Sequence, residues 1–369
     1  MAYVNEGCLS VVIRYLVGFA LFLLALPLYA VQVGGLYSAS VPVENQSQAV
    51  RNAAISEALK KVVVKVSGRK STLGNVQLRS ALSNVSAYVE QFQYKKRDDE
   101  QVGFWLTVSF QKAALDRVLS QFDVPVWGAN RPDVLLWLAV DDGKRYLVNT
   151  EQKGLAAVLQ QAAVDSGLVI TLPLLDLEDQ RSIGFNDVWA GFPEQIQRAS
   201  TRYGAKYVIF AQLLKSGTNR YRFNWTLINN EGRYTGVAQS NSKKGAFQLA
   251  FSQLAENLAD IYAPYGAVTK SQLIMEVSGV NNLESFVQVT RYLSSLDRVK
   301  KLSWGQLMDN KVTLELEVSG DGKALKDVIT LNNVLTPDFA PQQAIYNPID
   351  LQQLPAQRAP EKLFYRANN

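Results

Sequence analysis

The chain has 369 residues, a formal net charge of +5 and 47% hydrophobic residues, so it can bury more than one core. It contains no histidine and a single cysteine, Cys8. These are the usual residues for acid–base catalysis near neutral pH, for covalent catalysis and for binding zinc. The composition therefore argues against such enzymes, and we expect no catalytic residues, no cofactor and no metal site.

The first thirty residues have the pattern of an export signal. Arg14 precedes an apolar run, and a proline followed by Ala30 closes the segment. We expect cleavage after Ala30, which would leave residues 31–369 in the periplasm. The alternative is an uncleaved inner-membrane anchor, because the apolar segment has about 20 residues, enough to span a bilayer. Cys8 precedes the apolar run, so it is not placed to become a lipidated mature terminus.

Residues 31–123 are predicted to form a first α+β domain with the order β-α-α-β-β-α. Apolar residues recur every three or four positions after Ser47, which predicts a helix that ends at Gly68. Asn75 can cap a second helix. The remaining expected elements are strands at 36–43, 92–96 and 103–110 and a helix at 111–122.

A proline-rich linker at residues 123–132 leads to a middle α/β domain, residues 131–263, with two or three layers. The nearly continuous apolar run at 134–140 predicts a buried strand. The expected order is β-α-β-α-β-β-β-α. The other expected elements are strands at 168–172, 206–214, 221–228 and 234–240 and helices at 154–165, 193–203 and 246–262.

A second linker, residues 263–269, precedes a third α+β domain at 270–335 with the order β-α-β-β-α. Its final hairpin and helix, Val318–Val328, are similar to Val108–Val118 of the first domain. A repeat of one module would explain this similarity, although short helices after hairpins also look alike. Residues 336–369 are rich in proline, glutamine and asparagine, so we expect an extended or disordered tail. The predicted fold class is therefore α+β, with three small modules and a tail.

Motifs for catalysis are weak. Ser-x-x-Lys occurs three times without the partner motifs of penicillin-recognising enzymes, and phosphate-binding loops are absent from the sequence. Paired carboxylates could still hydrolyse glycans, and the candidates are Asp176, Glu178 and Asp187 between a strand and a helix. A hydrolase of cell-wall or surface glycan is therefore one alternative function.

Three residues are candidate contact sites. Arg69 ends a basic face of the first long helix, which is either a solvated face or a contact for lipid phosphates and anionic polymers. Trp127, in the linker, either wedges the first two domains together, which we favour, or presents a flat binding surface. Arg131 follows it in the same linker. Nucleic acid is disfavoured by the export signal and the modest net charge.

Several runs carry a family resemblance. They include Gly35–Tyr37, Val64–Arg69, Pro125–Gly128 and Leu135–Ala139. With these runs the chain resembles, from about residue 35 to residue 335, the bacterial family catalogued as domain of unknown function 2066. That resemblance implies an exported, envelope-associated protein and assigns no catalytic residues.

The middle domain carries a second, looser likeness at Ala205–Ala211 and Tyr221–Ile228. It is similar there to the amino-terminal domain of the Tol periplasmic protein and to curli-type secretion lipoproteins, which implies an adaptor or assembly role by analogy. We therefore predict a non-enzymatic periplasmic binding or assembly protein whose partner is an envelope protein, a glycan or lipid head groups. A second alternative, besides the glycan hydrolase, is a membrane-anchored carrier of a hydrophobic ligand. The oligomeric state is not indicated.

Overall fold

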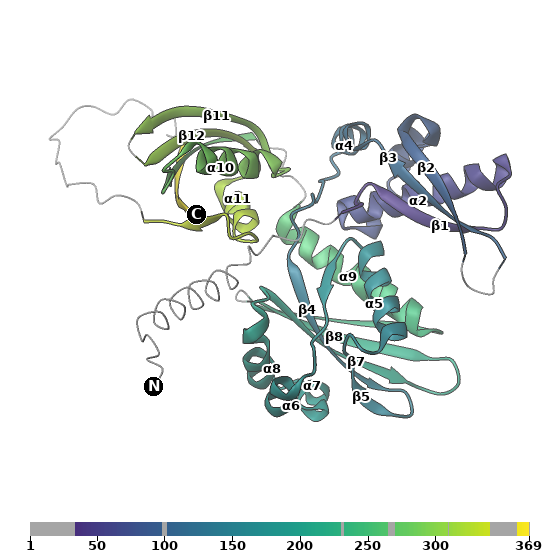
Figure 1. Ribbon diagram of the computed structural model, residues 1–369. Helices are drawn as coiled ribbons and strands as arrows, with labels where there is room; N and C mark the ends of the chain where they lie inside the picture. Colours follow the sequence, from purple (N-terminus) through teal and green to yellow (C-terminus); the bar gives the residue numbers. More distant parts are fainter. Residues whose placement is uncertain are drawn as a thin grey trace, which may run out of the picture. The chain divides into compact units, whose positions relative to one another are not determined.

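The computed structural model describes residues 34–97, 102–229, 232–264, 270–308, 310–339 and 360–368. The predicted export signal and most of the predicted tail lie outside these residues. None of the helices within the described ranges is long and apolar enough to cross a membrane. The described chain forms three β-sheets with helices packed on them, so the predicted α+β class is confirmed (Figure 1).

The first sheet has the strand order β1-β3-β2, and both pairings are antiparallel. Helix α2 packs on this sheet through apolar residues that recur every three or four positions, and α2 ends at Gly68, where φ is 69°. The elements are β1 (Ser38–Val43), α2 (Gln48–Ser67), η1 (Lys70–Gly74), α3 (Val76–Ala81), η2 (Val85–Tyr88), β2 (Val89–Lys96), β3 (Phe104–Phe110) and α4 (Lys112–Gln121).

The middle sheet has the order β5-β4-β7-β8-β9, with β6 paired to β4. Strand β4 is parallel to β7 and carries the apolar run that predicted a buried strand. The elements are β4 (Asp133–Asp141), β5 (Arg145–Leu147), α5 (Lys153–Asp165), β6 (Val169–Thr171), α6 (Leu177–Ser182), α7 (Phe185–Ala190), α8 (Pro193–Ser200), η3 (Thr201–Tyr203), β7 (Tyr207–Lys215), β8 (Tyr221–Asn229), β9 (Gly232–Ser240) and α9 (Lys243–Tyr262).

Both faces of the middle sheet are covered. Leu136 and Leu138 of β4 belong to the cluster that includes α5 and α9. Leu135 and Trp137, which point the opposite way along the strand, belong to the cluster with α7 and α8. Figure 1 shows α5 and α9 on one face and α6 to α8 on the other. The middle unit therefore has three layers, and β5, α6 and α7 are additional to the predicted elements.

The third sheet has the order β11-β12-β10-β14-β13. Buried side chains alternate along β10, β12 and β14, and they pack against the helices α10 and α11. The elements are β10 (Lys270–Ser278), α10 (Leu283–Ser295), β11 (Val299–Met308), β12 (Lys311–Ser319), α11 (Gly322–Ile329), β13 (Leu335–Pro337) and β14 (Glu361–Ala367).

The predicted flexible tail is wrong at its end. Strand β14 pairs parallel with β10 and antiparallel with β13. Leu363, Tyr365 and Ala367 are buried there, because they alternate with polar residues and so face the core together. The polar composition of the whole segment concealed this short alternation.

The first and third units share one connectivity. In each, the first strand pairs antiparallel with the second strand of the hairpin, which lies between its two neighbours; the orders are β1-β3-β2 and β10-β12-β11. This agreement supports the repeat that the sequence suggested. The middle and third units share one continuous buried cluster, whereas the first unit has its own.

Candidate functional site

Arg69, a predicted contact residue, lies between α2 and η1 and is only 3% exposed. Its Nη1 donates a hydrogen bond to the carbonyl oxygen of Ala263 at 2.9 Å, and its Nη2 donates to Oδ1 of Asp260 at 2.7 Å. The guanidinium therefore ties the end of α2 to the end of α9. Its prediction as a surface contact is wrong, because the charge is used inside the chain.

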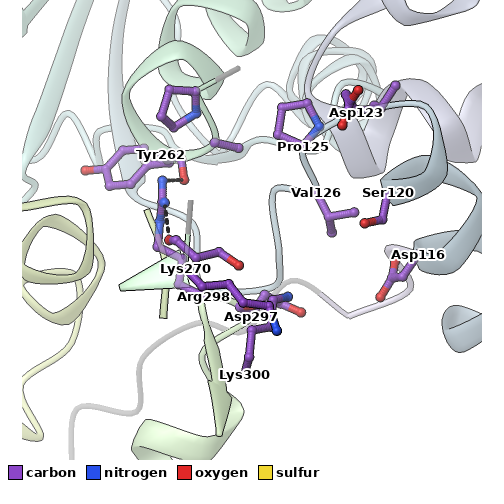
Figure 2. Close-up of a pocket in the computed structure, with 14 residues that line it drawn as sticks. Asp116, Ser120, Asp123, Pro125, Val126, Tyr262, Lys270, Asp297, Arg298 and Lys300 are labelled. Atoms are coloured by element: carbon purple, nitrogen blue, oxygen red, sulfur yellow. Dashed lines mark hydrogen bonds between the residues drawn. The ribbon is translucent and has the colours of Figure 1, made fainter. Parts of the chain in front are cut away.

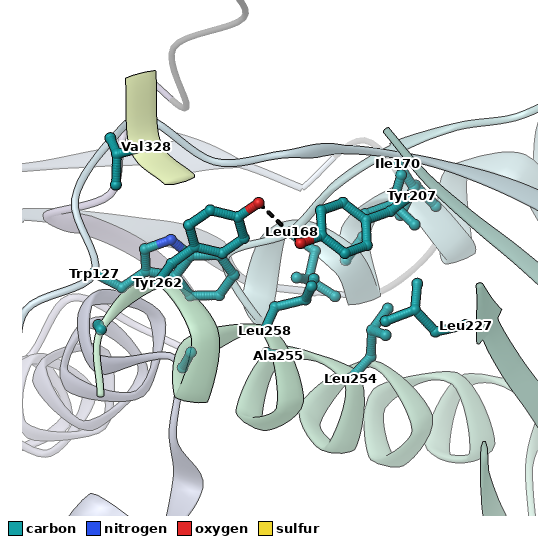
Figure 3. Packing of buried hydrophobic residues seen from close by; sticks show 14 of the residues in the cluster. Trp127, Leu168, Ile170, Tyr207, Leu227, Leu254, Ala255, Leu258, Tyr262 and Val328 are labelled. Atoms are coloured by element: carbon teal, nitrogen blue, oxygen red, sulfur yellow. Dashed lines mark hydrogen bonds between the residues drawn. The ribbon is translucent and has the colours of Figure 1, made fainter. Parts of the chain in front are cut away.

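Trp127 is 2% exposed and lies between the first and middle units, as the wedge interpretation predicts. Its backbone N–H donates to the carbonyl oxygen of Val66 at 2.8 Å. Its ring stacks on Tyr262, with centroids 6.1 Å apart and an interplanar angle of 4°. Figure 3 shows this stack and the hydrogen bond between the hydroxyls of Tyr262 and Tyr207. A flat binding surface at Trp127 is therefore not available.

The ring of Trp127 also explains Gly68. A Cβ at this position would lie 2.7 Å from Cε3 of Trp127 and 2.8 Å from Cβ of Ala259. The positive φ of Gly68 disfavours any other residue as well. Glycine at the end of α2 thus allows the helix, the linker and α9 to approach one another.

Arg131 is 5% exposed and donates four hydrogen bonds to carbonyl oxygens. Burial lowers the pKa of Arg131 to about 9. Its guanidinium carbon also lies 4.1 Å from the ring centroid of Trp127. The bonds run from Nε to Gly128 at 2.9 Å, from Nη1 to Gly167 at 2.7 Å, and from Nη2 to Lys65 at 2.7 Å and Trp127 at 2.5 Å.

The three predicted contact residues are thus brought together, but inside the molecule. We call Arg69, Trp127, Arg131 and Tyr262 the junction cluster. The guanidinium of Arg131 bonds only to backbone carbonyls, and that of Arg69 bonds to a carbonyl and to Asp260, so both buried cations are satisfied without a ligand. The junction cluster is therefore a structural element and not a binding surface.

A cavity of about 370 Å³ lies beside the junction cluster (Figure 2). Arg298 is buried in its wall, donates to the carbonyl oxygens of Ser319 and Tyr262, and has an Nε without a hydrogen-bond partner among the described atoms. Burial lowers the pKa of Arg298. The wall also holds Asp116 and Asp297, so its charge is mixed and selects neither cations nor anions.

Lys112 connects the two aspartates of that cavity. Its Nζ donates to Asp116 at 2.7 Å and to Asp297 at 2.9 Å. Burial opposes the charge, but these bonds raise the pKa of Lys112 above its ordinary value. Tyr37 donates to Asp116 at 2.5 Å, and burial together with that bond raises the pKa of Tyr37. Sequence reasoning missed this network, because its members come from the loop between α10 and β11, from α4 and from the residue before β1, and no motif joins them.

A second cavity, of about 360 Å³, lies within the first unit. Its wall is largely apolar, and its two charged residues, Lys60 and Arg79, are exposed cations. Within the described residues neither cation has an ion-pair or hydrogen-bond partner. We call this cavity the α2 groove. It is lined by Ser56, Leu59, Lys60, Val63, Leu73, Arg79, Leu82, Ser83 and Val85.

The predicted glycan-hydrolase carboxylates have structural roles. Asp176 caps α6 and binds Arg202 at 2.7 Å, and the hydrogen bond to Arg202 lowers the pKa of Asp176 to about 2. Glu178 lies 3.5 Å from the same guanidinium. Asp187 accepts a hydrogen bond from the backbone of Gly184 at 2.7 Å at the start of α7. Over the described ranges no group of three acidic or cysteine side chains could hold a metal ion.

The fold therefore defines an α+β protein with a three-layer middle unit and two smaller units that share a three-strand connectivity. Residues 30–128 match a family model described as a domain of unknown function (DUF8605). This match contains the first sheet, the α2 groove and Trp127. The resemblance to domain of unknown function 2066 stays a prediction.

Among the curated proteins, no match to the chain was found. Among solved structures, the chain is similar to the crystal structure of lipoprotein GNA1162 from Neisseria meningitidis, at 17% sequence identity and a TM-score of 0.22. The similarity covers 35% of this chain and 99% of that one. A likeness this distant carries no argument about function.

Proposed function

We propose that the protein is a non-catalytic binding or assembly protein of the bacterial envelope, and that it docks a protein partner at the end of β11. The observation that carries the proposal is three large apolar side chains at this end. Trp304 is 68% exposed, Leu307 55% and Met308 59%. We call these three residues the β11 patch. Exposed apolar groups that gather on one element are typical of an interaction site.

The position of β11 makes the β11 patch accessible. β11 lies at the edge of its sheet, and among the described strands only β12 pairs with it. In the ladder, Trp304 lies opposite Leu314 and Leu307 opposite Val312, and both partners are buried. Directly opposed residues point to the same face of a sheet. Trp304 and Leu307 therefore extend the apolar face beyond the part that the chain itself covers.

A protein partner fits this chemistry better than a glycan. Tryptophan and methionine are enriched in protein interfaces, where a few buried aromatic anchors supply most of the binding energy. The register of β11 shifts at two places, which disfavours the addition of another regular strand. Exposed Lys300 and Lys301 on the same strand favour a partner with acidic groups around an apolar pocket.

The envelope location is supported by the export-signal pattern of residues 1–30 and by the family resemblance. The non-catalytic role is supported by the lack of histidine and by the capping roles of Asp176 and Asp187. These observations are independent of the β11 patch.

The test is cross-linking in the native host with a photoreactive amino acid at position 304. The matched control places it at Val164, which is exposed on α5 of the middle unit. We expect one discrete adduct from position 304 and none from position 164. The purified partner should then bind the full chain, and Trp304→Ala should weaken that binding by about 30-fold, as for an interface anchor.

Two results would overturn the proposal: no adduct at position 304, or equal affinity of the Trp304→Ala variant for the captured protein. Release of fragments from peptidoglycan that is lost on replacing both Asp176 and Asp187 with Ala would instead establish the glycan hydrolase.

A further inference from the structure

The α2 groove has the construction of a small-molecule site. Its floor consists of Leu59 and Val63 of α2, which are buried, and Leu82 after α3. Leu73 and Val85, both half-buried, complete the apolar wall. Its volume of about 360 Å³ lies in the range of ligand pockets, which are mostly apolar with a few polar groups.

The groove exists because α2 has apolar side chains toward two sides. One side packs on the first sheet, and the other faces the segment from η1 to η2. That segment consists of three short helices, η1, α3 and η2, which do not fill the space over Leu59 and Val63. An apolar surface is therefore left open to a ligand.

The charged groups of the groove have one sign. Lys60 and Arg79 come from different helices and both line the cavity, and none of the described residues that line it is a carboxylate. The neighbouring Lys61 differs, because its Nζ lies 3.4 Å from Glu57. Two cations without a partner among the described residues, beside apolar walls, complement an acid group attached to an apolar chain, since arginine binds carboxylates through paired hydrogen bonds.

We propose that the α2 groove binds a fatty-acid anion. Its acyl chain lies over Leu59 and Val63, and its carboxylate binds Lys60 and Arg79. The site belongs to the first unit and does not depend on the β11 patch. A single chain is favoured over a two-chain lipid, because the volume is near the lower end of the ligand-pocket range.

The test is calorimetric titration of the full chain with dodecanoate below its micelle concentration. We expect saturable binding with one site. The charge variant Lys60→Gln with Arg79→Gln should weaken it about tenfold, the effect of losing charged hydrogen bonds at an exposed site. The matched control Lys61→Gln should change it less than about twofold, because Lys61 already pairs with Glu57.

A second variant tests the apolar part. Ser56→Phe places a ring in the cavity from a half-buried position, and it should abolish binding while circular dichroism shows that the fold is kept. Dodecyltrimethylammonium, with the same chain and the opposite charge, should bind at least about tenfold more weakly than dodecanoate, and butyrate should not bind.

The proposal is overturned by a lack of saturable binding, by equal affinity in the charge variant, or by equal affinity for the cationic amphiphile. Binding to vesicles of anionic phospholipid without binding to dodecanoate would replace the fatty acid by a membrane surface and would also overturn it. The adduct at position 304 should be unchanged in the charge variant, so this proposal and the protein-docking proposal fail separately.

Discussion

The basic residues of α2 are buried and hydrogen-bonded at the end of the helix, but exposed or half-buried along its middle. At its end, Lys65 is buried, and the helix is held by Arg131 and Arg69. Along its middle, Lys60 is exposed beside the α2 groove, and within the described residues it has no partner. One basic helix face in a sequence can therefore include both residues that stabilise the fold and residues that line a ligand site.

At the buried end of α2, the polar groups of Lys65 have hydrogen-bond partners. Lys65 donates to the carbonyl oxygens of Ser38 at 2.9 Å and of Gly35 at 3.4 Å, and burial lowers the pKa of Lys65. Its carbonyl oxygen in turn accepts from Arg131. Donors and acceptors that already have partners contribute to stability, whereas those without partners are available to a ligand.

Loss of the Trp127 ring is expected to have the largest effect on stability. Trp127→Ala should lower the free energy of unfolding by about 3–5 kcal/mol, because it leaves a cavity between the first and middle units. Urea denaturation measures it. Trp127→Phe should cost clearly less, since the indole N–H has no partner among the described atoms. If the affinity for dodecanoate falls in both variants, the buried end of α2 and the α2 groove are not independent, because the groove then depends on the junction cluster.

A smaller effect is expected at Arg131. Arg131→Leu leaves four carbonyl oxygens, three of them buried, without their donor and should cost about 2–3 kcal/mol. Arg131→Lys should recover little of this loss, because an ammonium group cannot reproduce the planar fork. Full stability of the leucine variant in urea denaturation would show that these bonds do not fasten α2.

The smallest effect is a pH dependence at Lys65. Its pKa is lowered in the folded chain from 10.5, so the unfolded chain binds more protons and stability rises with pH. This contribution is complete above pH 10.5 and is lost as the pH falls through the lowered pKa. The free energy of unfolding, measured across this pH range, should rise less steeply with pH in Lys65→Met than in the unchanged chain. A parallel pair of curves would mean that Lys65 keeps its ordinary pKa.

Much of the fold could be predicted from local patterns. The helix that ends at Gly68 and the apolar strand β4 were predicted, because periodicity and a glycine stop are local signals. Strand β14 was missed, since its pairing with β10 joins distant parts of the chain. The short helices α6 and α7 were also missed, because few residues carry their pattern.

The candidate sites were harder to predict than the fold. Arg69 is a predicted contact because it ends a basic face, and Arg131 because it lies in the linker of Trp127. Both are buried against carbonyl groups, of Ala263 and Gly167, which leave no mark in a sequence. Lys60 belongs to the basic face of the first long helix, which the sequence indicates. That Lys60 lines the same cavity as Arg79 is visible only in the structure.

Because β14 lies far along the chain, the third sheet is completed much later than the first. The first sheet has all of its strands once residue 110 has been made, whereas β10 pairs with β12 but receives its second neighbour only with residues 361–367. Until then one edge of β10 is unpaired, and such an edge can pair with another chain. A chain that emerges from its amino-terminal side can therefore finish its first unit early, while the third unit stays open to wrong pairing until residues 361–367 have emerged.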